Sequence, residues 1–424
     1  MDLSKHDKIY RWIVLFMGTL SFLVLGFVYG WSVLLTPLEA DFGWNRAQVT
    51  VAYTVSMLSL YLGMLLNGII TRHLKGKLTA YIGVAFIVVG YVISSFAGSL
   101  GLSGRGDLWI FYIFYGVLLG FGSGIGYSTW LALSVEWFPE RPGFATGVSM
   151  MGYGFGGLVF APAATALLAK GISWSIILRC TGIVAFVVLT GSLLAAKPAP
   201  DYITGMKSGK SQSHTNLTGL DVTPGKMFAG PVYWAFSVWK IVINGTATAV
   251  IGQAAKIVTD AGASAAFAAT CVSLISIGNG TGRVLSGIIT DRFGMVKTMI
   301  GISSLLFLTQ IGFLVGYAKS LWFLMPVITL VFGFNYGAGT TYNCMFVRGV
   351  WGAKNYKANM GFNSLASIPA VLFASSFISM AKANTGSYLR FFQVSTPLAA
   401  LTIAGAVGII ALVRRIAADP KNIR

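Results

Sequence analysis

Three basic side chains lie inside long apolar segments, where a charge is costly. Arg283 is the deepest of them, within the apolar run of residues 264–290. An arginine at the centre of a membrane helix costs about 2.5–3.5 kcal/mol on insertion scales. None of the acidic residues falls in the middle of an apolar run, and a guanidinium binds a carboxylate through two parallel hydrogen bonds. We therefore predict that a substrate carboxylate is the counter-ion of Arg283; contacts with backbone carbonyls are the alternative.

The two other basic side chains are closer to the ends of their runs. Arg179 is a few residues from such an end, so its long stem can carry the charge to the surface. Lys240 lies about eight residues into its run, roughly 12 Å at 1.5 Å per residue. It either reaches the surface in the same way or faces a cavity.

The sequence gives no support to other kinds of chemistry. The three histidines lie near or beyond the ends of apolar runs, and Cys180, Cys271 and Cys344 show no metal-ligand spacing. No acid/base pair or nucleophile lies at depth. An enzyme, a metal site and a cofactor site are therefore not expected.

The apolar runs themselves are long enough to be membrane-spanning helices. The chain has 424 residues, of which 55% are hydrophobic and only 10% are charged, with a mean hydropathy of +0.75. A membrane core of about 30 Å needs roughly twenty apolar residues per helix, and only helices or closed barrels satisfy their backbone there. We predict an all-α integral membrane protein with twelve transmembrane helices at residues 12–36, 48–71, 78–97, 108–134, 142–168, 174–196, 228–255, 264–290, 296–317, 320–347, 357–381 and 388–413.

The net charge of +18 is unevenly distributed. Most lysines and arginines fall in the alternate segments that share a side with the two termini. This bias predicts that both termini are cytoplasmic, so the basic excess reflects topology and not a nucleic-acid partner. We expect a multi-pass protein of the inner (plasma) membrane, surrounded by lipid and monomeric.

A polar segment divides the predicted helices into two sets of six. Residues 197–227 are rich in Gly, Ser, Thr, Pro and Lys, which is typical of a mobile cytoplasmic linker between residues 1–196 and 228–424. The tetrapeptide Gly-Ile-Ile-Thr closes the second run of each half, at 68–71 and at 287–290. Repeated halves of this kind are the architecture of major facilitator transporters.

The second copy resembles a loop motif of the major facilitator superfamily. The stretch "GIITDRFGMVK" has glycine, three residues, Asp-Arg, one residue and glycine. In that family the aspartate pairs with a neighbouring helix, and the basic residues help to hold the inner gate closed. The resemblance implies a gating role for Gly287, Asp291, Arg292 and Gly294. In the first copy Arg72 takes the place of the aspartate.

Two further stretches resemble the oxalate/formate antiporters, and one resembles the monocarboxylate transporters. The antiporter-like stretches are "GFVYGWSVLLTPLEADFGWNRAQV" and "EWFPERPGFATGVSMMGYGFGG"; the transporter-like one is "NGTGR", which supplies Asn279 and Arg283. The resemblance implies that tyrosines of the first half line a substrate cavity, namely Tyr29, Tyr127 and Tyr153. Further candidates in the second half are Asn279, one turn from Arg283, and Phe334, Tyr336, Phe362 and Asn363.

The glycines of "GYGFGG" at 152–157 and "GFGSGIG" at 120–126 lie inside apolar runs. A dinucleotide-binding loop needs a preceding strand, so we predict instead that these glycines allow close helix packing.

We expect a secondary transporter that couples a small monocarboxylate to a proton by alternating access of the two halves. Oxalate transporters carry a lysine in span eleven, whereas the stretch "GFNSLASIPAV" is uncharged, with Ser367 near that position. One deep arginine thus matches one negative charge, and lactate is the leading substrate, with pyruvate or acetate as others.

Asn279 and Lys240 are the positions considered for proton coupling; because an amide does not titrate, the proton travels with the acid or on Lys240. The alternatives are an anion exchanger of the oxalate/formate type and a transport-dead membrane sensor.

Overall fold

Apolar runs separated by short polar turns fold into long helices in the computed structural model of this chain. The structure describes residues 5–71, 74, 76–101, 104–200, 203 and 217–419. Arg72 of the first loop copy and most of the predicted linker lie outside the described residues. Within the described ranges every regular element is helical, as the sequence predicts.

The chain divides into two compact units. The first comprises Met1–Trp137 and Gly152–Gly205, and the second Phe138–Met151 and Met206–Arg424. One boundary therefore falls inside helix α7, whose first ten residues group with the second unit. The fold of each unit follows from its own helices.

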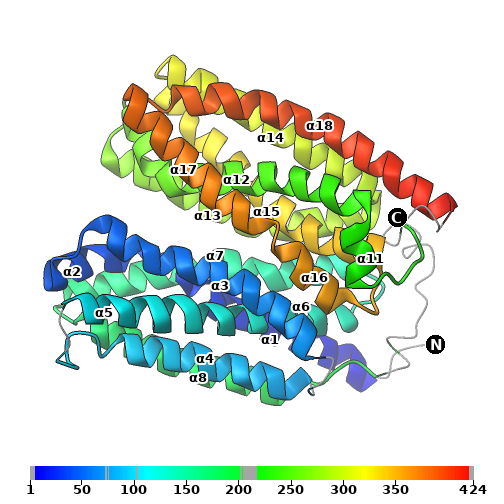
Figure 1. The fold of residues 1–424 in the computed structure, drawn as a ribbon, viewed down its shortest axis with the longest axis horizontal. Coiled ribbons are helices and arrows are strands. Elements are labelled where there is room, and N and C mark those ends of the chain that lie inside the picture. Colours follow the sequence, from blue (N-terminus) through cyan, green and yellow to red (C-terminus); the bar gives the residue numbers. More distant parts are fainter. Residues whose placement is uncertain are drawn as a thin grey trace. The chain divides into compact units, whose positions relative to one another are not determined.

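The elements of the first unit, together with the shared α7, follow the predicted spans (Figure 1). They are α1 (Lys5–Leu25), η1 (Gly26–Gly30), α2 (Ser32–Phe42), α3 (Arg46–Ile70), α4 (Gly76–Ser94), α5 (Gly104–Ile110), η2 (Phe111–Leu118), α6 (Leu119–Glu136), α7 (Pro142–Ala169) and α8 (Trp174–Ala195). Two predicted spans are less regular than expected. A 3-10 stretch interrupts the first at η1, and a π-helical stretch, η2, lies between α5 and α6 in the fourth.

The second unit contains long helices and several short ones (Figure 1). They are α11 (Pro224–Ala229), α12 (Pro231–Asp260), α13 (Ala265–Phe293), α14 (Met295–Ala318), η3 (Trp322–Leu324), α15 (Met325–Trp351), α16 (Tyr356–Ser364), α17 (Ser367–Thr385) and α18 (Leu389–Ala418).

Length and composition make the chain a multi-pass membrane protein. Among the described residues, eleven helical segments are long and apolar enough to cross a bilayer. Helix α13, which corresponds to the eighth predicted span, is not among these eleven described segments. Large apolar side chains such as Phe16, Trp109 and Leu401 are more than 60% exposed, as expected for surfaces that face lipid.

The glycine-rich stretches serve close helix packing, as predicted. A Cβ atom added to Gly152 of α7 would lie 2.1 Å from the carbonyl oxygen of Thr19 in α1. One added to Gly124 of α6 would lie 2.1 Å from the carbonyl oxygen of Leu60 in α3. Any side chain at these positions would push the helices apart, so the glycines set the helix spacing of the first unit.

The eleventh span is broken between α16 and α17 at Leu365 and Ala366. Pro369 explains the break: in a continuous helix it could not donate to the carbonyl of Leu365, and its ring would clash there. The chain restarts instead, with the amide of Ile368 donating to Leu365 at 3.0 Å and proline in the first turn of α17. The break releases carbonyl groups near the end of α16 for other partners.

The described end of the predicted linker is held by hydrogen bonds to the end of α15. The amide of Leu217 donates to Gly349 at 2.9 Å, and that of Val222 donates to Trp351 at 3.0 Å. Asp221 accepts a bond of 3.0 Å from the amide of Lys354. This part of the linker, predicted to be mobile, is therefore anchored.

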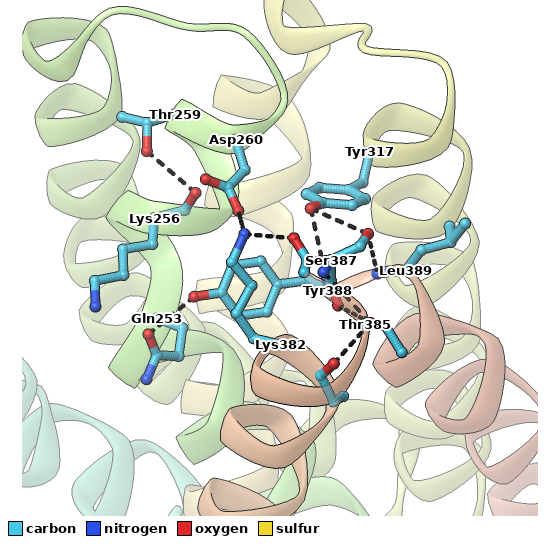
Figure 2. A network of polar contacts seen from close by, with 12 residues as sticks. Gln253, Lys256, Thr259, Asp260, Tyr317, Lys382, Thr385, Ser387, Tyr388 and Leu389 are labelled. Carbon is cyan, nitrogen blue, oxygen red and sulfur yellow. Dashed lines mark hydrogen bonds and ion pairs between the residues drawn. The ribbon is translucent and has the colours of Figure 1, made fainter.

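A polar network joins the ends of α12, α14, α17 and α18 (Figure 2). Lys382 forms an ion pair with Asp260, and the amide of Tyr388 donates to the hydroxyl of Tyr317 at 3.2 Å. The hydroxyl of Tyr388 donates to Gln253 at 3.1 Å, and burial raises the pKa of Tyr388. Asp260 is the last residue of α12, whereas the buried Lys240 lies in the first half of that helix, so this network does not include that lysine.

Candidate functional site

Arg283 is buried in the second unit, with only 2% of its surface exposed. Its Nε donates to Oδ1 of Asn279 at 3.0 Å, one turn earlier on α13, and its Nη1 donates to the carbonyl oxygen of Met150 on α7 at 3.2 Å. Two neutral oxygens thus orient the guanidinium. The pairing with Asn279 follows the expected four-residue spacing, whereas Met150 was not predicted.

Glycines on both helices hold α13 close to α15. A Cβ atom added to Gly337 would lie 2.0 Å from the carbonyl oxygen of Asn279, and one added to Gly282 would lie 2.1 Å from that of Phe334. The backbone of Phe334 therefore lies against the helix that carries Arg283. The side chains of Phe334 and Tyr336 are half-buried on α15.

Lys240 is buried in α12 with 1% of its surface exposed, which excludes the predicted alternative of snorkelling. Its ammonium group donates to the carbonyl oxygen of Asn363, next to the break between α16 and α17. The amide group of Asn363 donates to Oδ1 of Asn343 at 2.8 Å, and Tyr233 donates to the carbonyl of Phe362 at 3.3 Å. Lys240 and Asn363, predicted separately, are therefore neighbours.

Arg179 behaves differently from the two deeper cations. It is only half-buried, its Nε donates to Oγ of Ser95 at 3.1 Å, and its guanidinium carbon lies 4.4 Å from the ring centre of Phe96. Hydrogen bonding and stacking over an aromatic ring account for this arginine near the start of α8.

The three predicted tyrosines of the first unit lie together. The ring centres of Tyr29 and Tyr153 are 5.1 Å apart, and those of Tyr127 and Tyr153 are 5.6 Å apart, all in edge-on contact. Phe22 completes the group at 5.0 Å from Tyr127. Tyr29 lies in η1, so the irregular turn of the first span places it beside α7.

The loop motif is also built as a contact with α7. Asp291 accepts hydrogen bonds from the amides of Gly143 at 3.0 Å and Phe144 at 2.8 Å, which begin α7. Gly294 has a positive φ of 84°, which favours glycine, and separates α13 from α14. Arg292 places its guanidinium 5.4 Å from the ring centre of Phe293.

Several contacts of the second unit involve residues that the sequence did not single out. Asn343 and Cys344 follow each other on α15: the first accepts from Asn363, and the sulfur of the second lies 3.8 Å from that of Met150. In the part of the chain that the structure describes, no three His, Cys, Asp or Glu side chains gather in a way that could hold a metal ion.

The sequence matches the Major Facilitator Superfamily over residues 12–368. The chain belongs to this superfamily. The major facilitator fold and its multi-pass membrane setting, both predicted from the sequence, are thereby confirmed. The chain is a transporter by family, and the superfamily's members are not enzymes in general.

Among similar proteins are transporters of carboxylates. An uncharacterized MFS-type transporter of Escherichia coli, YhjX, is 27% identical over 358 residues, or 83% of each chain. The oxalate:formate antiporter of Oxalobacter formigenes is 23% identical over 291 residues, covering 68% of this chain and 65% of that protein. Human monocarboxylate transporter 12 is 27% identical over 164 residues, 38% of this chain and 30% of that protein. These relatives confirm the predicted branch of the superfamily.

Solved major facilitator structures share the fold. The proton:xylose symporter XylE superposes with a TM-score of 0.74 at 15% identity, covering 96% of both chains. The transporter FucP superposes with a TM-score of 0.69 at 12% identity, covering 94% of this chain and 99% of that one.

Proposed function

We propose that this major facilitator protein carries a small monocarboxylate together with a proton by alternating access, with lactate as the leading substrate and pyruvate or acetate as others. The observation that supports this most directly is the burial of Arg283 between the neutral oxygens of Asn279 and Met150. A guanidinium at membrane depth is expensive unless an anion accompanies it. A carboxylate fits its fork and supplies one negative charge.

Specificity in this proposal comes from the groups around the carboxylate. Asn279 holds the Nε side of the guanidinium, and a substrate carboxylate would compete with the carbonyl of Met150 for the Nη1 side. Phe334, Tyr336, Phe362 and Asn363 of the second unit are the residues that we propose to complete the surface around the acid, while Tyr29, Tyr127 and Tyr153 form an aromatic group within the first unit. Such aromatic and amide groups suit a short acid with one methyl group and one hydroxyl or keto oxygen.

Proton coupling follows from charge balance. Asn279 cannot titrate, so the proton would travel with the bound acid or on Lys240, whose ammonium group is buried against Asn363. Moving an anion with one proton leaves the loaded and empty carriers at the same net charge. Uptake would then follow the pH gradient and be nearly independent of membrane voltage.

The test is the uptake of radiolabelled lactate into proteoliposomes with an imposed pH gradient, while potassium and valinomycin set the voltage. Uptake that rises with inward proton gradient and is flat with voltage supports one-to-one symport. A steep dependence on voltage excludes it. If lactate does not accumulate although it binds, the protein is a sensor and not a transporter.

The second candidate is exchange of carboxylates across the membrane, including dianions. The observation in its favour is that a second buried cation, Lys240, lies in the same unit as Arg283. Two cations could accept two carboxylates of one substrate. Exchange requires anion on both sides, so uptake that needs internal anion and ignores the pH gradient would favour it over symport.

The remaining parts of the proposal concern the setting of the protein. The distribution of lysine and arginine supports cytoplasmic termini in an inner (plasma) membrane, and we propose that the transporter works as a monomer. Protease accessibility of a tag at each terminus in right-side-out vesicles tests the orientation.

A further inference from the structure

Four residues that the sequence linked to different roles recur at every fourth position of α13. They are Asn279, Arg283, Gly287 and Asp291. Residues with this spacing form one ridge along a helix. The proposed substrate ligand and the loop motif therefore belong to the same surface of α13, and the last three of them contact the first ten residues of α7.

The middle of this contact is made by glycines. A Cβ atom added to Gly287 would lie 2.1 Å from the carbonyl oxygen of Gly143, and one added to Gly147 would lie 2.3 Å from that of Arg283. Only residues without a side chain allow the two backbones to approach so closely. We call this contact the α7–α13 seam; all of its residues belong to the second unit.

A charged side chain of α13 closes each end of the seam. At one end Asp291 accepts from the first amides of α7, Gly143 and Phe144, where a negative charge is favoured by the helix dipole. At the other end Arg283 donates to the carbonyl of Met150. Arg283 therefore contacts α7 in two ways: its side chain donates to Met150, and its backbone carbonyl lies close to Gly147.

The bond between Arg283 and Met150 is well suited to being exchanged. At 3.2 Å it joins a cation to a neutral carbonyl, whereas a carboxylate offers two charge-assisted bonds. In a continuous helix the carbonyl of residue 150 also accepts from the amide of residue 154, and a carbonyl oxygen has two lone pairs. Losing the arginine therefore does not leave this carbonyl without a donor.

We infer that a substrate carboxylate takes the guanidinium of Arg283 away from Met150 and thereby loosens the α7–α13 seam, so that substrate binding itself starts the conformational change. This inference rests on the proposed function for the part played by the substrate. The seam itself is a feature of the substrate-free structure. Arg283 then has two roles: it binds the substrate, and it holds α7 against α13 when the substrate is absent.

A native cysteine reports on the seam. Cys344 is 1% exposed, and its sulfur lies 3.8 Å from that of Met150, so movement of this part of α7 would uncover it. Cys271 on α13 is fully buried and serves as the matched control, and Cys180 is exposed and confirms that the reagent is active. The experiment measures the alkylation rate of each cysteine by N-ethylmaleimide in the purified full-length protein, using peptide mass spectrometry.

Two variants are expected to open the seam while residue 283 itself remains arginine. Gly147→Ala places a methyl group against the carbonyl of Arg283, and Asp291→Asn removes the charge that holds the start of α7; the second serves if the first does not fold. Gly301→Ala on α14 is the control, because an added Cβ there has no neighbour within 4 Å.

We expect lactate to raise the alkylation rate of Cys344 severalfold in the unmodified protein. We expect the two seam variants to raise it without lactate, while Cys271 and the Gly301→Ala protein stay unchanged. The inference fails if lactate raises the melting temperature, and so binds, but leaves the Cys344 rate unchanged or lowers it. It also fails if both seam variants react like the unmodified protein.

The two proposals can fail separately. If lactate neither binds nor is transported, the proposed function is wrong and the exchange at Arg283 falls with it. The alkylation rates of Gly147→Ala and Asp291→Asn without lactate still decide whether the seam holds α7 against α13.

Discussion

Replacing Arg283 by lysine is the sharpest test of the proposed carboxylate site. Lysine keeps the positive charge but has no planar fork, so it can offer the substrate one strong bond where arginine offers two. A hydrogen bond to a charged group contributes about 1.5–3 kcal/mol. Losing one bond should therefore lower kcat/KM for lactate by about 10- to 150-fold, at about 1.4 kcal/mol per factor of ten.

Arg283→Ala removes both bonds and should cost more. The substrate loses about 3–6 kcal/mol of binding, or roughly 10²- to 10⁴-fold, and the buried Oδ1 of Asn279 loses its donor. Uptake should fall to background. The assay is initial-rate uptake of labelled lactate in proteoliposomes at a fixed pH gradient, with the amount of inserted protein measured for every variant.

Arg179→Lys is the matched control. This arginine also lies within a predicted span, but its guanidinium is half-buried and stacks on Phe96. Lysine should preserve transport there. Uptake by Arg283→Ala at the level of the unmodified protein would refute the carboxylate site and would leave Arg283 a structural residue held by carbonyl and amide oxygens.

Three further changes test neighbouring parts of the proposal. Oxalate should compete poorly with lactate in the unmodified protein, because its second charge would be desolvated, and Ser367→Lys should improve the competition; strong oxalate inhibition without the substitution would favour the exchanger. Asn279→Asp should shift the optimum of uptake to lower pH, because the new carboxylate must be protonated before the substrate can pair with Arg283; an unchanged profile would place residue 279 off the proton route. Gly337→Ala should destabilise the protein by about 1–3 kcal/mol through overpacking against α13, seen as a lower melting temperature than that of Gly301→Ala; equal melting temperatures would contradict the close packing of α13 and α15.

The helices could be predicted from the sequence because lipid permits few backbone arrangements. Long apolar runs must be helical in a membrane, and the structure follows the predicted spans closely. The irregular places were missed because their cause is local. Pro369 is visible in the sequence and explains the break before α17, but hydropathy averages over it and predicts one continuous span.

The candidate site could be predicted only where side chains carry the interaction. The pairing of Asn279 with Arg283 follows from helical spacing, and the depth of Arg283 marks it as costly. The position of Lys240 in its apolar run allowed two predictions, that its ammonium group reaches the surface or that it faces a cavity. In the structure the group is buried, because it donates to Asn363 beside the break between α16 and α17. A side chain eight residues from a helix end can face either way, and its direction depends on neighbours far away in the chain.

Met150 shows where prediction from sequence has to stop. Its part in the site is a backbone carbonyl, which every residue possesses, so no residue type at position 150 would indicate it. What the sequence does contain is the glycine spacing that brings this carbonyl within reach: Gly143 and Gly147 on α7 and Gly287 on α13. Because a glycine seam fixes the distance between two backbones, it also fixes which carbonyl a long side chain such as Arg283 can reach. In this transporter the small residues therefore decide how the charged residue is held, and a methyl group at position 147 should disturb Arg283 as surely as a change in its partner.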